Sequence, residues 1–151
     1  MIAVVDASVA LKWQFEDEEA TYGATGLLEN FVDGEIQLIA PTLFSYEIVS
    51  AVNVAINRKR ITDAEGYRVI KYLSSLEIEL RSFDELIDDT FHMARQYGLS
   101  PYDCAYMALA EKEKCDLFTG DRKLFNAIKS QFSWVQWIGD YSANNYLSSE
   151  D

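Results

Sequence analysis

Five short runs of apolar residues recur along the chain, and longer segments with helical spacing separate them. The apolar character of each run is continuous rather than alternating, which is typical of strands buried on both faces of a parallel sheet. The five runs are Ile2–Val5, Ile36–Ala40, Ile78–Arg81, Asp116–Thr119 and Trp134–Ile138. The pattern therefore predicts a central, mostly parallel, five-stranded sheet.

The segments between the runs carry apolar residues three and four positions apart, as in Thr42–Lys59, so we expect them to be helical. Three of these helices have a start signal in which a serine or threonine precedes an acidic residue by three positions, the capping-box pattern. The pairs are Thr62 with Glu65, Ser82 with Glu85, and Ser100 with Asp103. Because strands alternate with helices, we expect right-handed crossovers and a three-layer α/β/α domain.

The chain has 151 residues, which is the usual length of one domain and enough for an ordinary apolar core. We expect one folded domain over residues 1–141 and a flexible C-terminal tail over the Ser- and Asn-rich residues 142–151. Two cysteines, Cys104 and Cys115, are too few for a disulfide scaffold and are interpreted as reduced thiols. With no secretory leader and no apolar run near the roughly 18 residues of a membrane helix, the sequence predicts a cytoplasmic protein.

Acidic residues outnumber basic residues by 25 to 13, which gives a formal net charge of -12. This balance argues against a protein that binds nucleic acid or membranes through a basic surface. It does not exclude a nucleic-acid enzyme that recruits cations. The acidic run Glu16–Glu19 is expected to form the charged first turn of a helix, where the helix dipole favours it.

Four acidic residues stand where ligands bind in an open parallel sheet, beyond the carboxyl ends of the strands. Asp6 follows the first predicted strand directly, and Asp121 comes two residues after the fourth. Glu47 and Asp103 lie near the starts of two predicted helices that the topology brings toward the same edge. Glu47 also interrupts an otherwise apolar segment, where a carboxylate is costly unless it is paired or bound to a cation.

Carboxylates gathered within a few ångströms repel one another unless a hard cation neutralises them. Mg²⁺ is the natural occupant because it prefers oxygen ligands and is commonly held by carboxylates together with substrate phosphate. Two such ions would activate an attacking water and stabilise the leaving oxygen of a displacement at phosphorus. The four acids therefore predict a magnesium site for phosphodiester chemistry.

Each acid also has a purely structural interpretation. Asp6 and Asp121 are suited to cap the helices that follow them, and Asp103 is suited to complete the capping box of Ser100. Glu47 is compatible with a salt-bridged side chain on a partly exposed helix face. The sequence leaves both interpretations open.

Other polar residues adjoin these acids. Ser8 and Thr119 lie two positions from the first and last acid, so their hydroxyls would either orient the carboxylates or bond to the local backbone. Arg122 and Lys123 follow the last acid directly and are candidates for contact with a substrate phosphate.

Four segments, in this order and with this spacing, resemble the signature segments of PIN-domain ribonucleases, and most closely those of the VapC-type toxins of prokaryotic toxin–antitoxin pairs. The segments are Val4–Ser8, Tyr46–Val52, Tyr102–Ala110 and Phe118–Leu124. The resemblance extends from the first residue to about Tyr141. It departs at Gly120, where a larger residue is common.

The resemblance implies a PIN-like fold and Mg²⁺- or Mn²⁺-dependent endonucleolytic cleavage of RNA. It identifies Asp6, Glu47, Asp103 and Asp121 as the catalytic and metal-binding acids. It also implies a small antitoxin protein that covers the site, and a homodimer. Two other functions remain open, namely a non-catalytic PIN-like binding or scaffold protein and a PIN nuclease of RNA processing without an antitoxin. A haloacid-dehalogenase-type phosphatase fits less well, because it needs Asp-x-Asp where this chain has Asp6–Ser8.

Overall fold

The computed structural model describes residues 1–15, 17–146 and 148, and its described residues form one five-stranded sheet. The strands are β1 (Ile2–Val5), β2 (Gln37–Pro41), β3 (Glu79–Arg81), β4 (Asp116–Thr119) and β5 (Val135–Trp137). Their order across the sheet is β3-β2-β1-β4-β5, and every neighbouring pair is parallel. The predicted five-stranded parallel sheet is confirmed, and it is parallel throughout.

The central strand β1 explains why the apolar runs are continuous. Val4 pairs with Ile39 on β2 and with Leu117 on β4, and all three side chains are fully buried. Because helices cover both faces of the sheet, the side chains on both faces of the strand are buried. β-branched residues such as Val4 pack well in this pleated, buried setting.

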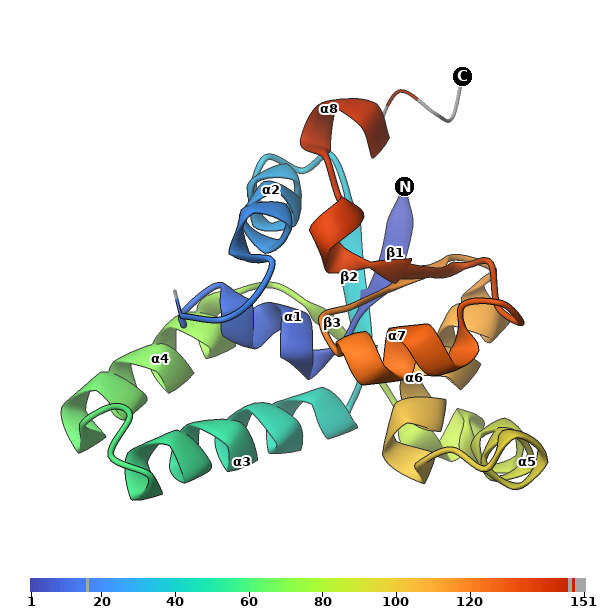
Figure 1. Cartoon of the computed structure of the whole chain (residues 1–151), viewed down its shortest axis with the longest axis horizontal. Helices are drawn as coiled ribbons and strands as arrows, with labels where there is room; N and C mark the ends of the chain where they lie inside the picture. Colours follow the sequence, from blue (N-terminus) through green and yellow to red (C-terminus); the bar gives the residue numbers. More distant parts are fainter. Residues whose placement is uncertain (16, 147, 149–151) are drawn as a thin grey trace.

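Helices alternate with the strands as predicted. They are α1 (Ala7–Lys12), α2 (Thr21–Val32), α3 (Leu43–Asn57), α4 (Asp63–Ser75), α5 (Ile87–Tyr97), α6 (Pro101–Glu113), α7 (Arg122–Ile128) and α8 (Ala143–Tyr146), with short 3₁₀ turns η1 (Phe83–Glu85) and η2 (Ile138–Asp140). In Figure 1, α1–α4 lie to the left of the central strands and α5–α7 to the right. This three-layer α/β/α arrangement is the one that right-handed crossovers give for this strand order.

The three predicted helix starts differ in outcome. Thr62 forms the complete capping box with Glu65 at the start of α4. Ser82 instead caps η1 by accepting a hydrogen bond from the Asp84 backbone, and α5 begins only at Ile87. Ser100 caps α6 through the Tyr102 backbone N–H, 3.2 Å from its hydroxyl. The box predicted for Ser100 is therefore reduced to a single cap.

The acidic run before α2 is not the first turn of a helix, which corrects the prediction made for it. Asp17, Glu18 and Glu19 lie in the loop that precedes α2, and Glu16 lies outside the described residues. These three acids pair with cations from other elements rather than with a helix dipole. Asp17 and Glu18 contact Arg60, and Glu19 contacts Arg122.

The C-terminal segment packs against the sheet as far as it is described. Residues of α8 follow Tyr141, and the Tyr146 hydroxyl donates a hydrogen bond to Asp116, 2.6 Å away. The Tyr146 ring also meets the Phe118 ring edge-on, with 5.2 Å between centroids. Of the tail predicted over residues 142–151, positions 147 and 149–151 lie outside the described residues. The described part of the chain has no helix with the length and apolar character that a bilayer span requires.

Candidate active site

The four predicted acids come from four separate elements at the carboxyl edge of the sheet. Asp6 joins β1 to α1, and Asp121 joins β4 to α7. Glu47 lies in the second turn of α3, which follows β2, and Asp103 lies in the first turn of α6. Because β1, β2 and β4 are parallel neighbours, the residues that follow them emerge at the same edge.

Asp6 is the most buried of the four acids, with 7% of its surface exposed. Its carboxylate caps α1 by accepting from the Val9 backbone N–H at 3.3 Å, and it also accepts from the Ser8 hydroxyl. Burial raises the pKa of Asp6 to about 6, and the nearby Asp103 adds to this, while hydrogen bonds with Ser8, Thr119 and Val9 oppose the rise. Asp6 is therefore both a helix cap and an acid held in an unfavourable environment.

Ser8 ties the ends of two strands together. Its hydroxyl donates to Asp6 after β1 and accepts from the Gly120 backbone N–H after β4, at 2.8 Å. Thr119 also connects two of the acids, since its hydroxyl accepts a hydrogen bond from the Asp121 backbone N–H at 3.1 Å and forms another with Asp6. These contacts agree with both sequence interpretations of the two hydroxyl residues, because each one bonds to a carboxylate and to the backbone.

Asp103 lies at the electrostatic centre of the cluster. Partial burial, together with the negative charges of Asp121 and Glu47, raises the pKa of Asp103 to about 6. Among the described residues, neither a hydrogen-bond donor nor a cation contacts its carboxylate. The capping role open to Asp103 in the sequence is therefore wrong, and its repulsion by the other acids is left without compensation.

Glu47 is held by a residue that the sequence analysis did not single out. The Tyr106 hydroxyl on α6 donates to Glu47 Oε1 at 2.6 Å. Burial and the negative charges of Glu47 and Asp6 raise the pKa of Tyr106, so its hydroxyl keeps the proton that it donates. Tyr106 lies three positions after Asp103 on the same helix and hence on the same face, which is the one signal in the sequence that points to it.

Asp121 is exposed and caps α7, with its carboxylate 3.0 Å from the Leu124 backbone N–H. The capping interpretation of Asp6 and Asp121 is thus confirmed as a set of hydrogen bonds. It does not compete with the cluster, because each capping bond uses one carboxylate oxygen and leaves acceptor capacity on the other.

The cations nearest the site are already engaged. Arg122 pairs with Glu19, and its guanidinium lies 4.4 Å from the centre of the Trp137 ring. Lys12 on α1 is buried, with Nζ 3.9 Å from a Glu18 oxygen. Lys123, in contrast, is exposed at the start of α7.

Gly120 leaves room for the buried Lys12 side chain. A Cβ atom at position 120 would overlap the Lys12 side chain and lie 3.2 Å from the Ser8 carbonyl oxygen. The glycine that departs from the PIN-like pattern thus lies where the Lys12 side chain passes close to the backbone.

The donor set suits a hard divalent cation. All four acids offer carboxylate oxygens, which Mg²⁺ and Mn²⁺ prefer. Within the described residues, no three acidic, histidine or cysteine side chains are grouped closely enough to hold an ion as they stand. The acids instead interact in pairs, each with Asp103. A bound cation would offset the cost of burial and the repulsion that raise the pKa values of Asp6 and Asp103.

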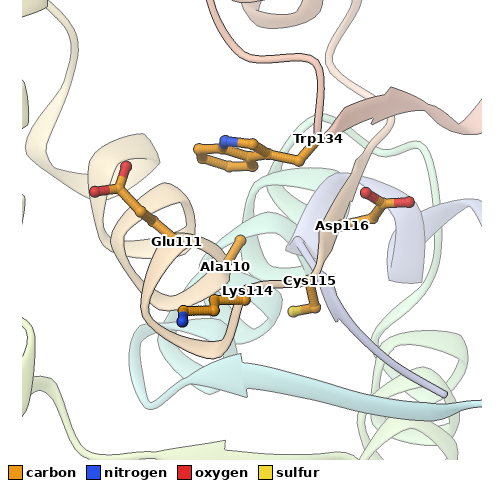
Figure 2. Close-up of a pocket in the computed structure, with 6 residues that line it drawn as sticks. All are labelled: Ala110, Glu111, Lys114, Cys115, Asp116 and Trp134. Atoms are coloured by element: carbon orange, nitrogen blue, oxygen red, sulfur yellow. The ribbon is translucent and has the colours of Figure 1, made fainter.

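A separate pocket lies at the opposite end of β4. Figure 2 shows the residues that line it, which are Ala110, Glu111, Lys114, Cys115, Asp116 and Trp134. Burial raises the pKa of the Cys115 thiol to about 11, so the thiol stays protonated at neutral pH and is a poor nucleophile. Cys115 and Cys104 are both free thiols, and this pocket has no part in the acidic site.

Fold and site together define a class of protein, an α/β/α domain with carboxylates from separate elements at the carboxyl edge of a parallel sheet. The sequence profile of the PIN domain family matches residues 3–130. The chain belongs to this family, which confirms the resemblance found in its signature segments.

The chain is also similar over most of its length to proteins named as VapC ribonucleases. The chain is 31% identical to ribonuclease VapC3 of Pyrobaculum aerophilum over 126 residues, which is 82% of this chain and 92% of the relative. It is 30% identical to VapC ribonuclease Mb0985 of Mycobacterium bovis over 128 residues, covering 85% of this chain and 92% of the relative.

Two crystal structures share the fold. The PAE2754 protein of Pyrobaculum aerophilum superposes with a TM-score of 0.63 at 20% identity, covering 99% of this chain and 94% of its own. A chain of VapBC2 from Rickettsia felis, bound to a DNA fragment from its promoter, superposes with a TM-score of 0.61 at 15% identity. The superposition covers 91% of this chain and 98% of the VapBC2 chain. At these identities the likeness bears on the fold alone.

Proposed function

We propose that this protein is a cytoplasmic endoribonuclease that depends on Mg²⁺ or Mn²⁺ and is the toxin of a type II toxin–antitoxin pair. The observation that carries the proposal is Asp103, whose carboxylate has no hydrogen-bond donor or cation partner among the described residues and interacts with three other acids at the carboxyl edge of the sheet. The relatives named as VapC ribonucleases support RNA as the substrate.

In this proposal Asp6, Glu47, Asp103 and Asp121 hold the cation. A divalent ion held there would supply activation of a water and stabilisation of negative charge at the scissile phosphate. The chain's own residues fix the ligands in advance, because hydrogen bonds from Ser8 and Val9 restrain Asp6. Water is added across a P–O bond, so the products are two RNA fragments.

Arg122 and Lys123 would guide the RNA backbone toward the acids. Lys123 is exposed beside Asp121 and is free to contact a phosphate. Arg122 would have to exchange its bond with Glu19 for one with RNA. Both residues lie in the first turn of α7, where the partial positive charge of the helix terminus adds to their own.

A small antitoxin protein is the proposed inhibitor. The VapBC2 structure from Rickettsia felis supports a partner of this kind, since it contains such a protein pair. An inhibitor that places an arginine or lysine against the acids would form strong, charge-assisted hydrogen bonds with them. Purification of the chain from its native operon should therefore yield a co-eluting small protein, and its absence would leave a PIN nuclease of RNA processing.

A homodimer is the proposed assembly. Tyr46 on α3 and Tyr102 on α6 are exposed and flank an apolar groove next to the acids. Exposed apolar patches of this kind mark interaction surfaces. Light scattering on the purified chain tests the assembly, because a dimer has twice the 17.2 kDa mass of the chain.

Isosteric substitution of the acids tests the proposed activity. Asp103→Asn and Glu47→Gln should each lower the RNA cleavage rate by orders of magnitude, since both ligands would be lost without a change in shape. Asp33→Asn is the matched control, because Asp33 is an exposed acid at the end of α2, away from the cluster. Full activity in both site variants would indicate a contaminating nuclease and a non-catalytic PIN-like scaffold.

A further inference from the structure

The Tyr106 side chain joins three elements beneath the acidic cluster. It extends from α6 and is 3% exposed, with its ring in the apolar core. Its hydroxyl donates to Glu47 on α3 and forms a hydrogen bond with the Ala7 backbone at the start of α1. The hydroxyl also lies close enough to Asp6 to feel its charge.

Glu47 needs such a restraint more than the other acids do. Its side chain has one more rotatable bond than aspartate and is only half-buried, so a conformation pointing into solvent is open to it. The charge of Asp103 favours that conformation, because the two carboxylates repel each other. Within the described residues, the Tyr106 hydroxyl is the only hydrogen-bond donor to the Glu47 carboxylate, and no cation pairs with it.

We propose that Tyr106 is a positioning residue that holds the Glu47 carboxylate toward the other acids, ready to bind a divalent cation. The inference rests on the proposed function, since it assigns Glu47 as a ligand. A hydrogen bond to a carboxylate is stronger and shorter than one between neutral groups, and the 2.6 Å distance fits this class. Tyr106 would thus offset the repulsion that otherwise drives Glu47 away.

Metal affinity without RNA measures this role directly. In Tyr106→Phe the ring remains in the core and only the hydroxyl is lost, so the fold is retained while Glu47 is released. Calorimetric titration with Mn²⁺ should give a dissociation constant roughly 10- to 100-fold weaker than that of the wild type, the scale of losses for residues that support metal ligands. The number of bound ions per chain should decrease or stay the same.

Tyr141→Phe is the matched control. Tyr141 is also a buried tyrosine whose hydroxyl has a hydrogen bond, in this case from the Asn30 side chain, and it lies outside the cluster. Its loss should lower stability without a change in Mn²⁺ affinity. A loss of Mn²⁺ affinity as large as that in Tyr106→Phe would show that both effects are general consequences of a weakened core, and would overturn the inference.

A double-mutant cycle separates action through Glu47 from a direct effect. Glu47→Gln should weaken Mn²⁺ binding, and adding Tyr106→Phe to it should change the affinity by less than about two-fold, because the residue it positions is no longer a ligand. Additive losses would contradict a role through Glu47. Unchanged Mn²⁺ affinity in Tyr106→Phe would overturn the inference and leave the proposed function intact, whereas no Mn²⁺ binding by the wild type would overturn both.

A measurement on the wild type avoids any folding defect of the variants. With ¹³C-labelled tyrosine rings, the Tyr106 resonances should shift as Mg²⁺ is added, because its hydrogen-bond partner becomes a ligand. The Tyr141 resonances should stay in place. A Tyr106 signal that does not move at saturating Mg²⁺ would overturn the inference.

Discussion

Substitution of Asp103 by asparagine should stabilise the protein in the absence of metal. The pKa of Asp103 is about 6, against an ordinary value of 3.8, so its charged form is disfavoured in the folded state at neutral pH. One pKa unit corresponds to about 1.4 kcal/mol, and the partial exposure of the carboxylate reduces the effect through solvent screening. We expect the free energy of unfolding at pH 7.5 to rise by roughly 1–3 kcal/mol.

Asp103 is a better site for this experiment than the other acids. Asp6 and Asp121 cap helices, so their substitution also perturbs a hydrogen bond. The Asp103 carboxylate caps nothing among the described residues, and Asn keeps its shape. For a chain of this length, the gain corresponds to a rise in Tm of roughly 2–4 °C per kcal/mol.

The assay is thermal unfolding in chelator, with a pH series as an internal check. The native state binds more protons than the unfolded state between about pH 4 and pH 6, because the native pKa is the higher one. The free energy of unfolding of the wild type should therefore decrease as the pH rises through this window. The decrease should be smaller in Asp103→Asn, which lacks this titrating group. Part of the dependence should remain, because the pKa of Asp6 is raised in the same way.

Two outcomes would refute this reasoning. A lower Tm for Asp103→Asn in chelator would mean that the carboxylate stabilises the fold. Equal stabilisation of wild type and variant by Mg²⁺ would mean that Asp103 is not a ligand, since a ligand stabilises the state that binds it more tightly. Asp33→Asn should match the wild type in both conditions.

Two other substitutions test the surroundings of the site. Glu19→Gln should release Arg122 and remove a negative charge from the RNA path, so RNA binding in chelator should tighten by about two- to five-fold, as measured by fluorescence anisotropy. Gly120→Ala should lower the free energy of unfolding by about 1–3 kcal/mol in a urea titration, because the added methyl group overlaps the buried Lys12 side chain.

Each of these substitutions has a clear contrary result. For Glu19→Gln, the control is Glu85→Gln, which breaks an exposed ion pair with Lys112 on another part of the surface. Equal RNA affinity in the two variants would remove Arg122 from the proposed RNA path. For Gly120→Ala, wild-type stability would mean that Lys12 has room to move.

The strands and most helices were predictable because local pattern determines them. Short continuous apolar runs such as Ile2–Val5 are typical of strands buried on both faces, and the Thr62 capping box lies within four consecutive residues. Ser82 was predicted to open a helix, but it caps the 3₁₀ turn η1 and α5 begins at Ile87, because a serine followed by acidic residues suits a 3₁₀ turn as well as a helix. Local hydrogen bonding does not distinguish the two turns.

Features that depend on tertiary packing were not predictable. The acidic run before α2 satisfies the rule for a helix start, but its partners, Arg60 and Arg122, are distant in sequence. The bond from Tyr106 to Glu47 likewise joins residues 59 positions apart. The positions of the acids could be predicted because strand ends in a parallel sheet share an edge. The side chain that binds Glu47 could not be predicted in this way, because it comes from a helix that is distant in sequence.

The recovery of RNA cleavage on return of metal is the most direct test of the central claim. Purified protein should lose its activity toward RNA when EDTA removes divalent ions, and regain it when Mg²⁺ or Mn²⁺ is added in excess over the chelator. The Asp103→Asn variant, measured in parallel, should stay inactive after metal is returned. Wild-type cleavage that continues at the same rate in EDTA would contradict the account, because the four acids would then have no cation to hold.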